Sequence, residues 1–367
     1  MKRKGKDTEN DGTFASDHEL GQERNSPTQM SSYPCVATLK GHKEVVAAVR
    51  IGRHGSVLAS ASGDGTARAW DMETGDQVAS FDHQGHGVND VAYSWDDKIV
   101  ATACDDTIVR VWDPRAPERA AVRQLQGHTH HTMSCRFSAS GEILATAGFD
   151  ETIRVWCMHT GKMIRVIPGH SDPVISLDFS SDLTRPVLAS ASLDGICRLW
   201  STATGECHRS MVSSENPLPP LTFAKFTPNN KYVLIGSLDG KLRLWDFDSK
   251  HEPGTNMKPC PAVKKTYTGH KNDKFALQAS FLVNEPSDKK YVVCGSEDHH
   301  IYFWDLNSKE IKGVLQGRDS PEAAGNGHCD AVHAVDTSIH QPLVASAGGS
   351  NDRTVKLWRY NTTNAED

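Results

Sequence analysis

Seven tryptophans in this chain each follow an aspartate by six residues. The Asp/Trp pairs are Asp64/Trp70, Asp106/Trp112, Asp150/Trp156, Asp194/Trp200, Asp239/Trp245, Asp298/Trp304 and Asp352/Trp358. Successive tryptophans of this series lie 42, 44, 44, 45, 59 and 54 residues apart. Self-similarity at such a period is typical of repeat architectures, in which each unit buries its apolar face against its neighbours. We therefore expect seven similar structural units.

The third unit shows what one repeat contains. Between Gly127 and Cys157, the runs TMSCRF, EILATAG and TIRVW are separated by the turn residues SASG and FDE. Runs of this length predict antiparallel strands joined by hairpins, and a fourth run, MIRVIPG, leads to the next Gly-His. A unit of about 40–45 residues with Gly-His near its start and Trp-Asp near its end resembles the WD40 repeat, a four-stranded propeller blade.

The predicted fold class is therefore all-β, a seven-bladed WD40 β-propeller that occupies residues 33–360. The segment CVATLK at 35–40 is the candidate N-terminal strand that closes the ring by completing the last blade. Residues 1–32 are polar with one aromatic side chain, Phe14, and are predicted to form a disordered tail. Residues 361–367 are predicted to form a short C-terminal tail.

The resemblance to WD40 repeats assigns a structural role to the recurring polar residues. In such repeats the aspartate accepts a hydrogen bond from the Gly-His imidazole, and a serine or threonine hydroxyl connects this pair to the tryptophan. A buried indole N–H without an acceptor would cost roughly 1–3 kcal/mol. The sequence predicts three complete sets, which are His42, Ser60, Asp64 and Trp70; His128, Thr146, Asp150 and Trp156; and His170, Ser190, Asp194 and Trp200.

Four units depart from this pattern, and we expect incomplete sets there within an intact fold. The second unit has Gly85-His86 two residues closer to its aspartate than the first and third units do. The fifth has SSENPLPP in place of Gly-His and Ile235 in place of the hydroxyl. The sixth has Cys294 at the hydroxyl position, and in the seventh Ser346 lies six residues from Asp352.

Composition excludes several classes of function. The net charge is −6 with no long basic stripe, so direct binding of nucleic acid is not expected. No apolar run approaches the length of a membrane span, which predicts a soluble intracellular protein without a membrane role. The basic start, with Lys2, Arg3, Lys4 and Lys6, is either a nuclear signal or part of a solvated tail.

Motifs for catalysis are also missing. The sequence contains no P-loop, dinucleotide-binding, G-x-S-x-G or H-E-x-x-H motif. The richest histidine cluster, His128, His130 and His131, has no cysteine or carboxylate at ligand spacing beyond the structural pair. We therefore expect no metal, no cofactor and no enzymatic activity, and we expect a monomeric disc that binds protein partners.

Longer stretches resemble one propeller family in order from about residue 33 to 358. They include HSDPV (170–174), GFDETIRVW (148–156), KFTPNNKYVL (225–234), KTYTGHKND (265–273) and CGSEDHHIYFWDL (294–306). This family is the WD-repeat core subunit of COMPASS/MLL-type histone H3 lysine-4 methyltransferase complexes. The resemblance implies two peptide sites, one at a mouth of the channel and one in a cleft on the side of the disc.

At the channel mouth, family members hold an arginine from a histone tail or from the methyltransferase between two phenylalanines. Met133 and Gln278 occupy the two clamp positions here, which makes arginine binding in that mode doubtful. The fourteen matching positions are Ala47, Gly63, Asn89, Asp105, Met133, Phe149, Ile175, Leu193, Thr222, Phe223, Phe275, Ala276, Gln278 and His333. A structural role as channel lining is the alternative for them.

The side cleft is implied to bind a short acidic and hydrophobic segment of a scaffold subunit. Its residues in this chain are Asn229, Tyr232, Leu242, Phe281, Val283 and Asn307, the last in place of a glutamine. Asn229 also suits a turn and the apolar members also suit strands, so purely structural roles remain the alternative.

The main hypothesis is a non-catalytic adaptor of a histone H3 lysine-4 methyltransferase complex. Its partners would be a SET-domain methyltransferase, companion subunits and the histone H3 tail, and its location nuclear, with the cytoplasm as a second site. A substrate receptor of a cullin-RING ubiquitin ligase is an alternative, because Trp112-Asp113-Pro114-Arg115 matches the W-D-x-R element of such receptors. A generic propeller scaffold in RNA processing is the third hypothesis.

Overall fold

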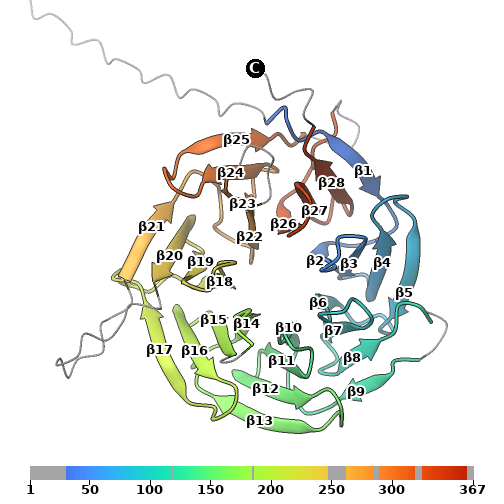
Figure 1. Ribbon diagram of the computed structural model, residues 1–367, viewed down its shortest axis with the longest axis vertical. Coiled ribbons are helices and arrows are strands. Elements are labelled where there is room, and N and C mark those ends of the chain that lie inside the picture. Colours follow the sequence, from blue (N-terminus) through green and yellow to red (C-terminus); the bar gives the residue numbers. More distant parts are fainter. Residues whose placement is uncertain are drawn as a thin grey trace, which may run out of the picture.

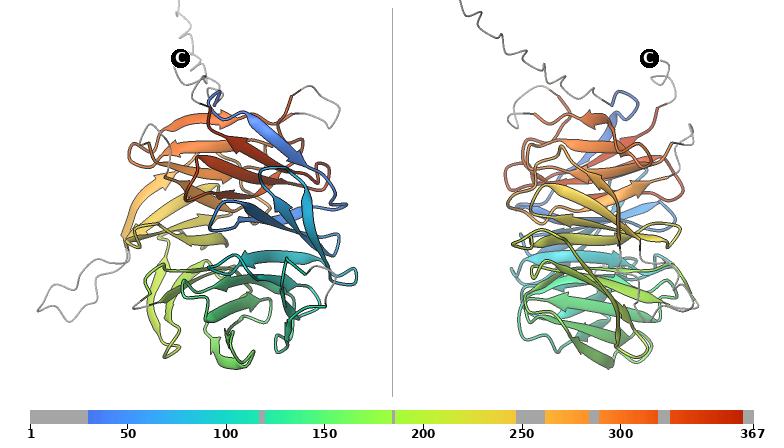
Figure 2. Two further views of the ribbon diagram at one scale, coloured as in Figure 1. Left: turned by 45° about the vertical axis from the view of Figure 1, so that its right-hand side comes forward. Right: turned by 90° about the vertical axis from the view of Figure 1, so that its left-hand side faces the viewer.

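The computed structural model describes residues 30–116, 120–183, 186–246, 262–283, 289–318 and 325–361. In this part of the chain, seven four-stranded antiparallel sheets surround a central channel (Figure 1). Figure 2 shows the resulting disc turned toward its edge. The structure thus confirms the predicted seven-bladed β-propeller.

Each blade begins with its innermost strand at the channel and ends with its outermost strand at the rim (Figure 1). Blade one consists of β2 (Val46–Ile51), β3 (Val57–Ser62), β4 (Thr66–Asp71) and β5 (Gln77–Asp82). Blade two consists of β6 (Val88–Tyr93), β7 (Val100–Cys104), β8 (Val109–Trp112) and β9 (Arg123–Leu125). Blade three consists of β10 (Thr132–Phe137), β11 (Ile143–Gly148), β12 (Thr152–Cys157) and β13 (Met163–Pro168).

The second half of the chain continues in the same order. Blade four consists of β14 (Val174–Phe179), β15 (Val187–Ser192), β16 (Ile196–Ser201) and β17 (Cys207–Val212). Blade five consists of β18 (Leu221–Phe226), β19 (Tyr232–Ser237), β20 (Lys241–Asp246) and β21 (Ala262–Tyr267). Blade six consists of β22 (Ala279–Leu282), β23 (Tyr291–Gly295), β24 (Ile301–Asp305) and β25 (Ile311–Leu315). Blade seven consists of β26 (Val332–Thr337), β27 (Leu343–Gly348), β28 (Val355–Arg359) and β1 (Cys35–Leu39).

Blade seven closes the ring with strands from both ends of the propeller. As predicted, β1 pairs antiparallel with β28, with Leu39 opposite Val355. Just before the predicted start of the propeller at residue 33, the backbone N–H of Met30 donates to the carbonyl of Val314 (2.8 Å). Tyr33 is 1% exposed and packs against the ring of Phe303. Residues 1–29 and 362–367 of the predicted tails lie outside the described residues.

The three predicted hydrogen-bonded sets are present. In blade one the Trp70 indole N–H donates to Ser60 Oγ (2.8 Å), His42 Nε2 lies 2.7 Å from the same oxygen, and His42 Nδ1 lies 3.0 Å from Asp64 Oδ2. The sets of blades three and four have the same arrangement. Because the hydroxyl accepts from the indole, its own proton points to Nε2, which leaves the Nδ1 proton for the carboxylate.

Blade seven corrects the expectation of an incomplete set. The Trp358 indole N–H donates to Ser346 Oγ (2.9 Å), and His328 lies between Ser346 (2.7 Å) and Asp352. The longer GGSND turn therefore brings the aspartate back to the same place. Burial raises the pKa of Asp352, but the hydrogen bonds from His328 and Thr354 and the charges of His328 and Lys356 together lower it to about 2.

Blade two uses a different histidine from the one that the Gly-His pattern indicates. His83 Nε2, not His86, lies 2.8 Å from Thr102 Oγ1, which also accepts from the Trp112 indole N–H (3.0 Å). The other ring nitrogen of His83 faces the carbonyl of Phe81 (3.1 Å), while Asp106 forms an ion pair with Arg110. The set is incomplete, as expected, because its aspartate pairs with Arg110 and not with the histidine.

Blades five and six satisfy their polar groups by other means. In blade five Glu215 forms an ion pair with Arg243, which also binds Asp239, so an ionic cluster replaces the histidine. In blade six the Trp304 indole N–H donates to the backbone carbonyl of Thr268 (2.9 Å). Both ring nitrogens of His270 are buried without a hydrogen-bond partner among the described residues.

A second polar system, which the sequence analysis missed, links the innermost strands of neighbouring blades around the channel. Blades one to four are joined in order by Arg50 Nη2 to Asp90 Oδ1 (3.3 Å), Ser134 Oγ to Asp90 Oδ2 (2.9 Å) and Leu177 N to Ser134 Oγ (3.2 Å). Blades four to six are joined by Phe226 N to Asp178 Oδ2 (2.8 Å) and Lys225 Nζ to Ser280 Oγ (2.9 Å). Blade seven is joined to blades six and one by Ser280 Oγ to Asp336 Oδ1 (3.2 Å) and Ile51 N to Asp336 Oδ2 (3.0 Å). Every blade is thus joined to both neighbours at the channel.

Removing the apolar anchor of the closing strand should weaken the whole ring. Leu39 is 3% exposed and packs in the core between blades seven and one, whereas Val36 on the same strand is 51% exposed. Leu39→Ala should lower the free energy of unfolding by about 2–4 kcal/mol, because it leaves a cavity. Val36→Ala should change it by less than about 0.5 kcal/mol in the same urea titration. Equal effects of the two substitutions would contradict closure by β1.

His270 should make stability depend on pH. Burial lowers its pKa to about 4, against about 6.5 in the unfolded chain. The folded protein therefore binds fewer protons between these values, and its stability falls as the pH drops from about 6.5 to about 4. His270→Leu should reduce that fall by about 1–3 kcal/mol, measured by urea unfolding at about pH 7 and about pH 4.5.

His128→Leu is the matched control for that substitution. His128 bridges Thr146 and Asp150, so its loss should cost about 1–3 kcal/mol already at about pH 7, where His270→Leu should cost much less. An unchanged pH slope in His270→Leu would contradict the assignment of the slope to this histidine.

Candidate functional site

One end of the channel opens into a cavity of about 320 Å³. It is lined by Val45, Ala47, Asn89, Met133, Ile175, Thr222, Phe275, Ala276, Gln278, Asp330, His333 and Ser350. Nine of the fourteen residues predicted for the channel mouth are among them. They come from the first residues of the innermost strands, such as Met133 on β10 and Ile175 on β14, and from the loop before β22.

The side chains at the two clamp positions, Met133 and Gln278, both face this cavity and are half-buried. A thioether and an amide cannot form the π-sandwich that a pair of phenylalanines gives to a guanidinium. The aromatic surface comes instead from Phe275, which is 42% exposed and contacts the His333 ring edge to face at 4.8 Å between centroids. One side of the mouth is therefore aromatic and the opposite side is aliphatic.

Glu297 fixes the position of Phe275. Its Oε1 accepts hydrogen bonds from the backbone N–H groups of Asp273 (2.9 Å), Lys274 (2.6 Å) and Phe275 (3.0 Å). Such charge-assisted bonds are stronger than neutral ones. Glu297 could not be predicted, because nothing in the turn SEDHH links this glutamate to the loop at residues 273–275 that connects blades five and six.

The other five predicted residues do not line the cavity. Phe223 is 3% exposed and lies deeper, where it borders the inner channel. Asp105 acts indirectly, since its carboxylate accepts from the Asn89 amide (2.7 Å). Phe149 stacks on His130 at 5.5 Å, and neither Gly63 nor Leu193 reaches the cavity. The site is therefore narrower than the resemblance implies.

The side cleft is a larger cavity of about 630 Å³ between blades five and six. It is lined by Thr227, Pro228, Asn229, Tyr232, Leu244, Lys264, Lys265, Phe281, Val283, Lys290, Leu306 and Asn307. Five of the six predicted cleft residues are thus brought together, namely Asn229, Tyr232, Phe281, Val283 and Asn307.

Leu242 is the predicted cleft residue that the structure places elsewhere. Both Leu242 and Leu244 point to the same face of β20, because side chains alternate along a strand. Leu242 pairs with Tyr267 and is completely buried, whereas Leu244 pairs with Lys265 at the cleft. Leu242 therefore lies one pleat away from the cleft lining, on the same face of β20 as Leu244.

The cleft combines an apolar floor with a basic rim. Phe281 and Leu244 form the floor with exposures of 4% and 3%. Lys264, Lys265 and Lys290 stand at the rim, and Lys265 Nζ donates to the carbonyl of Leu306 (2.7 Å). Lys290 is exposed and forms no ion pair with any residue that the structure describes.

Asn229 adds a polar contact to the cleft. Its Oδ1 accepts from the Thr227 hydroxyl (2.7 Å) and from the backbone N–H of Lys231 (3.1 Å). The amide nitrogen has no partner among the described residues and can donate to a ligand. The turn role and the binding role of Asn229 are therefore compatible.

Two other features bear on the alternatives. Among the residues that the structure describes, no group of three or more His, Cys, Asp or Glu side chains could hold a metal ion. Across the same residues, no helix is long and apolar enough to cross a membrane. Arg115 of the W-D-x-R element forms two hydrogen bonds with Asp113 (2.9 and 2.8 Å) and is exposed.

The fold and its recessed surfaces define a WD40-repeat propeller that acts as a scaffold for protein interactions. The profile of the WDR5 beta-propeller domain family matches residues 38–359, and the chain belongs to this family.

Curated relatives match shorter parts of the chain. The nuclear distribution protein nudF of Aspergillus niger is 39% identical over 107 residues, which is 29% of this chain and 24% of that protein. The WD repeat-containing protein 26 homolog of Arabidopsis thaliana is 26% identical over 150 residues, or 40% of this chain and 21% of that protein. Eukaryotic translation initiation factor 3 subunit I of Caenorhabditis briggsae is 33% identical over 104 residues, or 28% and 31%. The matches thus span less than a third of each relative's own length, and the three names differ widely.

Glu297→Ala should loosen the loop that presents Phe275. The three backbone N–H groups lose their acceptor, so amide hydrogen exchange at 273–275 should accelerate by at least about tenfold. Glu297→Gln keeps an oxygen acceptor and should show a smaller change. Exchange at wild-type rates in Glu297→Ala would mean that other contacts hold this loop.

Proposed function

We propose that this protein is a non-catalytic adaptor of a histone H3 lysine-4 methyltransferase complex of the COMPASS type, docked mainly through the side cleft. The observation that supports this most is the cleft itself. Its apolar floor and basic rim complement the acidic and hydrophobic segment that the resemblance implies for a scaffold subunit.

The relative affinities proposed for the two sites follow from their chemistry. The cleft retains Tyr232, Phe281 and Val283 around about 630 Å³, whereas the channel mouth offers about 320 Å³ and a single exposed aromatic ring. An arginine from the histone H3 tail or the methyltransferase would contact Phe275 on one side only. The proposal therefore assigns the main affinity to the cleft and a weaker, secondary contact to the channel mouth.

The proposed location is the nucleus, which follows from the proposed partners. The ligase hypothesis finds no support in the geometry, since Arg115 is held by Asp113. The varied names of the relatives keep a general scaffold in RNA processing as the second candidate, because WD40 propellers of similar sequence serve different assemblies.

Co-purification with a tagged full-length chain from native extract tests the proposal. Tyr232→Ala should remove the SET-domain methyltransferase and its companion subunits, because it deletes an aromatic contact from the cleft. Lys290→Glu should have the same effect by reversing a rim charge, while Lys43→Glu in blade one, equally exposed, should not. Phe281→Ala is unsuitable, because Phe281 belongs to the core and its loss would cost about 3–5 kcal/mol of stability.

Two results would contradict the proposal. Recovery of the same subunits with all three variants would exclude the cleft as the docking site. Recovery of a different assembly with the wild-type chain would exclude the complex itself. Thermal unfolding of Tyr232→Ala within a few degrees of wild type would exclude misfolding as the cause of a loss.

A further inference from the structure

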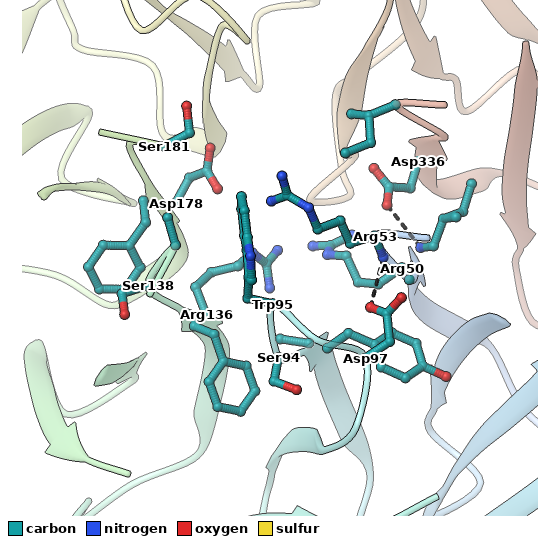
Figure 3. A pocket seen from close by; sticks show the side chains of 18 of the residues that line it. Arg50, Arg53, Ser94, Trp95, Asp97, Arg136, Ser138, Asp178, Ser181 and Asp336 are labelled. Atoms are coloured by element: carbon teal, nitrogen blue, oxygen red, sulfur yellow. Dashed lines mark hydrogen bonds between the residues drawn. The ribbon is translucent and has the colours of Figure 1, made fainter. Parts of the chain in front are cut away.

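The channel has a second opening, at the opposite face of the disc from Met133. Met133 is the second residue of β10 and Phe137 is the last, and the innermost strands all cross the disc in the same direction. A cavity of about 310 Å³ lies at this far end. Its walls include Phe137, Phe179 and Ile339. Arg50, Asp178 and Asp336 of the polar system described above also line it (Figure 3). Nothing in the proposed function uses it.

Trp95 and Arg53 form the most unusual feature of this cavity. Trp95 belongs to the turn between β6 and β7 and is 41% exposed. The guanidinium of Arg53, from the corresponding turn of blade one, stacks over its ring. Figure 3 shows Trp95 standing in the cavity with Arg53 on one side and Asp178 and Ser181 on the other.

The charges that line the cavity are nearly all paired within the protein. The lining contains four basic side chains, Arg50, Arg53, Arg136 and Lys225, and three acidic ones, Asp97, Asp178 and Asp336. Arg50 and Arg136 share the buried Asp90 behind the wall, and Lys225 binds Asp336 (2.9 Å).

The two remaining carboxylates are also occupied. Asp97 accepts from the backbone N–H of Arg53 (2.8 Å) and from His54 (2.9 Å). Asp178 accepts from the backbone N–H of Phe226 (2.8 Å), and the nearby cations Lys225 and Arg50 already face its charge.

Arg53 is the exception. Its guanidinium forms no hydrogen bond or ion pair with any described residue. Burial lowers its pKa from the ordinary value, and the charge of Asp97 opposes that shift. Stacking fixes the plane of the group and leaves its N–H edge free. Because stacking already restricts the guanidinium, binding a ligand would cost little further conformational entropy. The forked N–H groups of arginine match the two oxygens of a carboxylate.

We propose that the Arg53–Trp95 pair is the anchor of a third docking site, which binds a carboxylate side chain of a partner peptide at the channel opening opposite Met133. An apolar residue next to that carboxylate would fill the cavity against Phe137, Phe179 and Ile339. Tryptophan and arginine are the residue types most often found at the energetic centres of protein interfaces.

Charge decides between the possible anions. One carboxylate completes the pairing of Arg53, whereas a phosphate dianion would bring surplus negative charge next to Asp178, Asp336 and Asp97. A cationic side chain would meet four basic side chains in the cavity, and Asp178 already faces Lys225 and Arg50. The exposed apolar edges of Trp95 and Ile339 favour a peptide over a free small carboxylate, because they give apolar contact area beside the charge.

Selection from a displayed library of short random peptides tests the site. The full-length wild-type chain serves as bait, with Arg53→Gln as the counter-selection bait. We expect peptides that depend on Arg53 to share an aspartate or glutamate next to an apolar residue. Arg115→Gln, which changes an exposed arginine outside this cavity that pairs with Asp113, should retain the same peptides as wild type.

Calorimetry with one selected peptide then separates charge from shape. Replacing its acidic residue by the amide should weaken binding to wild type by at least about tenfold and should change nothing on Arg53→Gln. Trp95→Ala should weaken binding of the acidic peptide as well, because the guanidinium loses its support, and Trp95→Phe should retain most of the affinity.

Three results would overturn the proposal. The first is a selection with no peptides that depend on Arg53. The second is a selection dominated by basic or uncharged peptides. The third is binding of inorganic phosphate alone with the same dependence on Arg53, which would make this a small-anion site. Unchanged thermal unfolding of Arg53→Gln is required throughout, and Trp95→Phe provides an independent folded variant.

Discussion

Each buried indole N–H needs a hydrogen-bond acceptor, and this requirement determines how the polar residues inside the blades are arranged. Trp70, Trp156, Trp200 and Trp358 all donate to a buried serine or threonine hydroxyl, which then orients the histidine and the aspartate behind it. The requirement is for an acceptor and not for a particular residue type. Blade six shows this, because Trp304 uses a backbone carbonyl when Cys294 takes the hydroxyl position.

The two polar systems have different structural roles, one within each blade and one between neighbouring blades. The indole sets tie each blade's turn to its own strands, while the bonds among Asp90, Ser134, Ser280 and Asp336 tie neighbouring blades together at the channel. With both jobs fulfilled by interior residues, the loops at the two openings and on the rim are free to vary. The contrast between the aliphatic and aromatic channel mouth, the basic cleft and the Arg53–Trp95 opening is a result of that freedom.

Much of this structure could be predicted from the sequence, because the repeat supplies the same local signal seven times. The number of blades, the closing strand and three indole sets follow from it directly. His83 could not be predicted, since it lacks the preceding glycine and only the folded turn shows that it, and not His86, reaches Thr102. The completion of blade seven depends on the path of a longer turn, which a count of residues does not reveal.

The sites were predictable to the level of a surface but not of each side chain. The resemblance implied Leu242 for the cleft, and Leu244 shares its face of β20, yet which of the two lines the cleft depends on which of them Tyr267 covers. Contacts between repeats carry no sequence signal at all. Arg53 and Trp95 lie in turns of different blades, and Glu297 supports a loop that precedes its own sheet.

Ring closure also has a consequence for biosynthesis. The partner of β1 is β28, so Cys35 can pair with Trp358 only after all the strands between them have been synthesised. Until then the edge of β1 is unpaired and Leu39 lacks its neighbours from blade seven, which is a condition that favours aggregation of nascent chains. The first strand of the propeller, β1, is therefore the last to pair, and chaperone binding during translation is expected to concentrate on it.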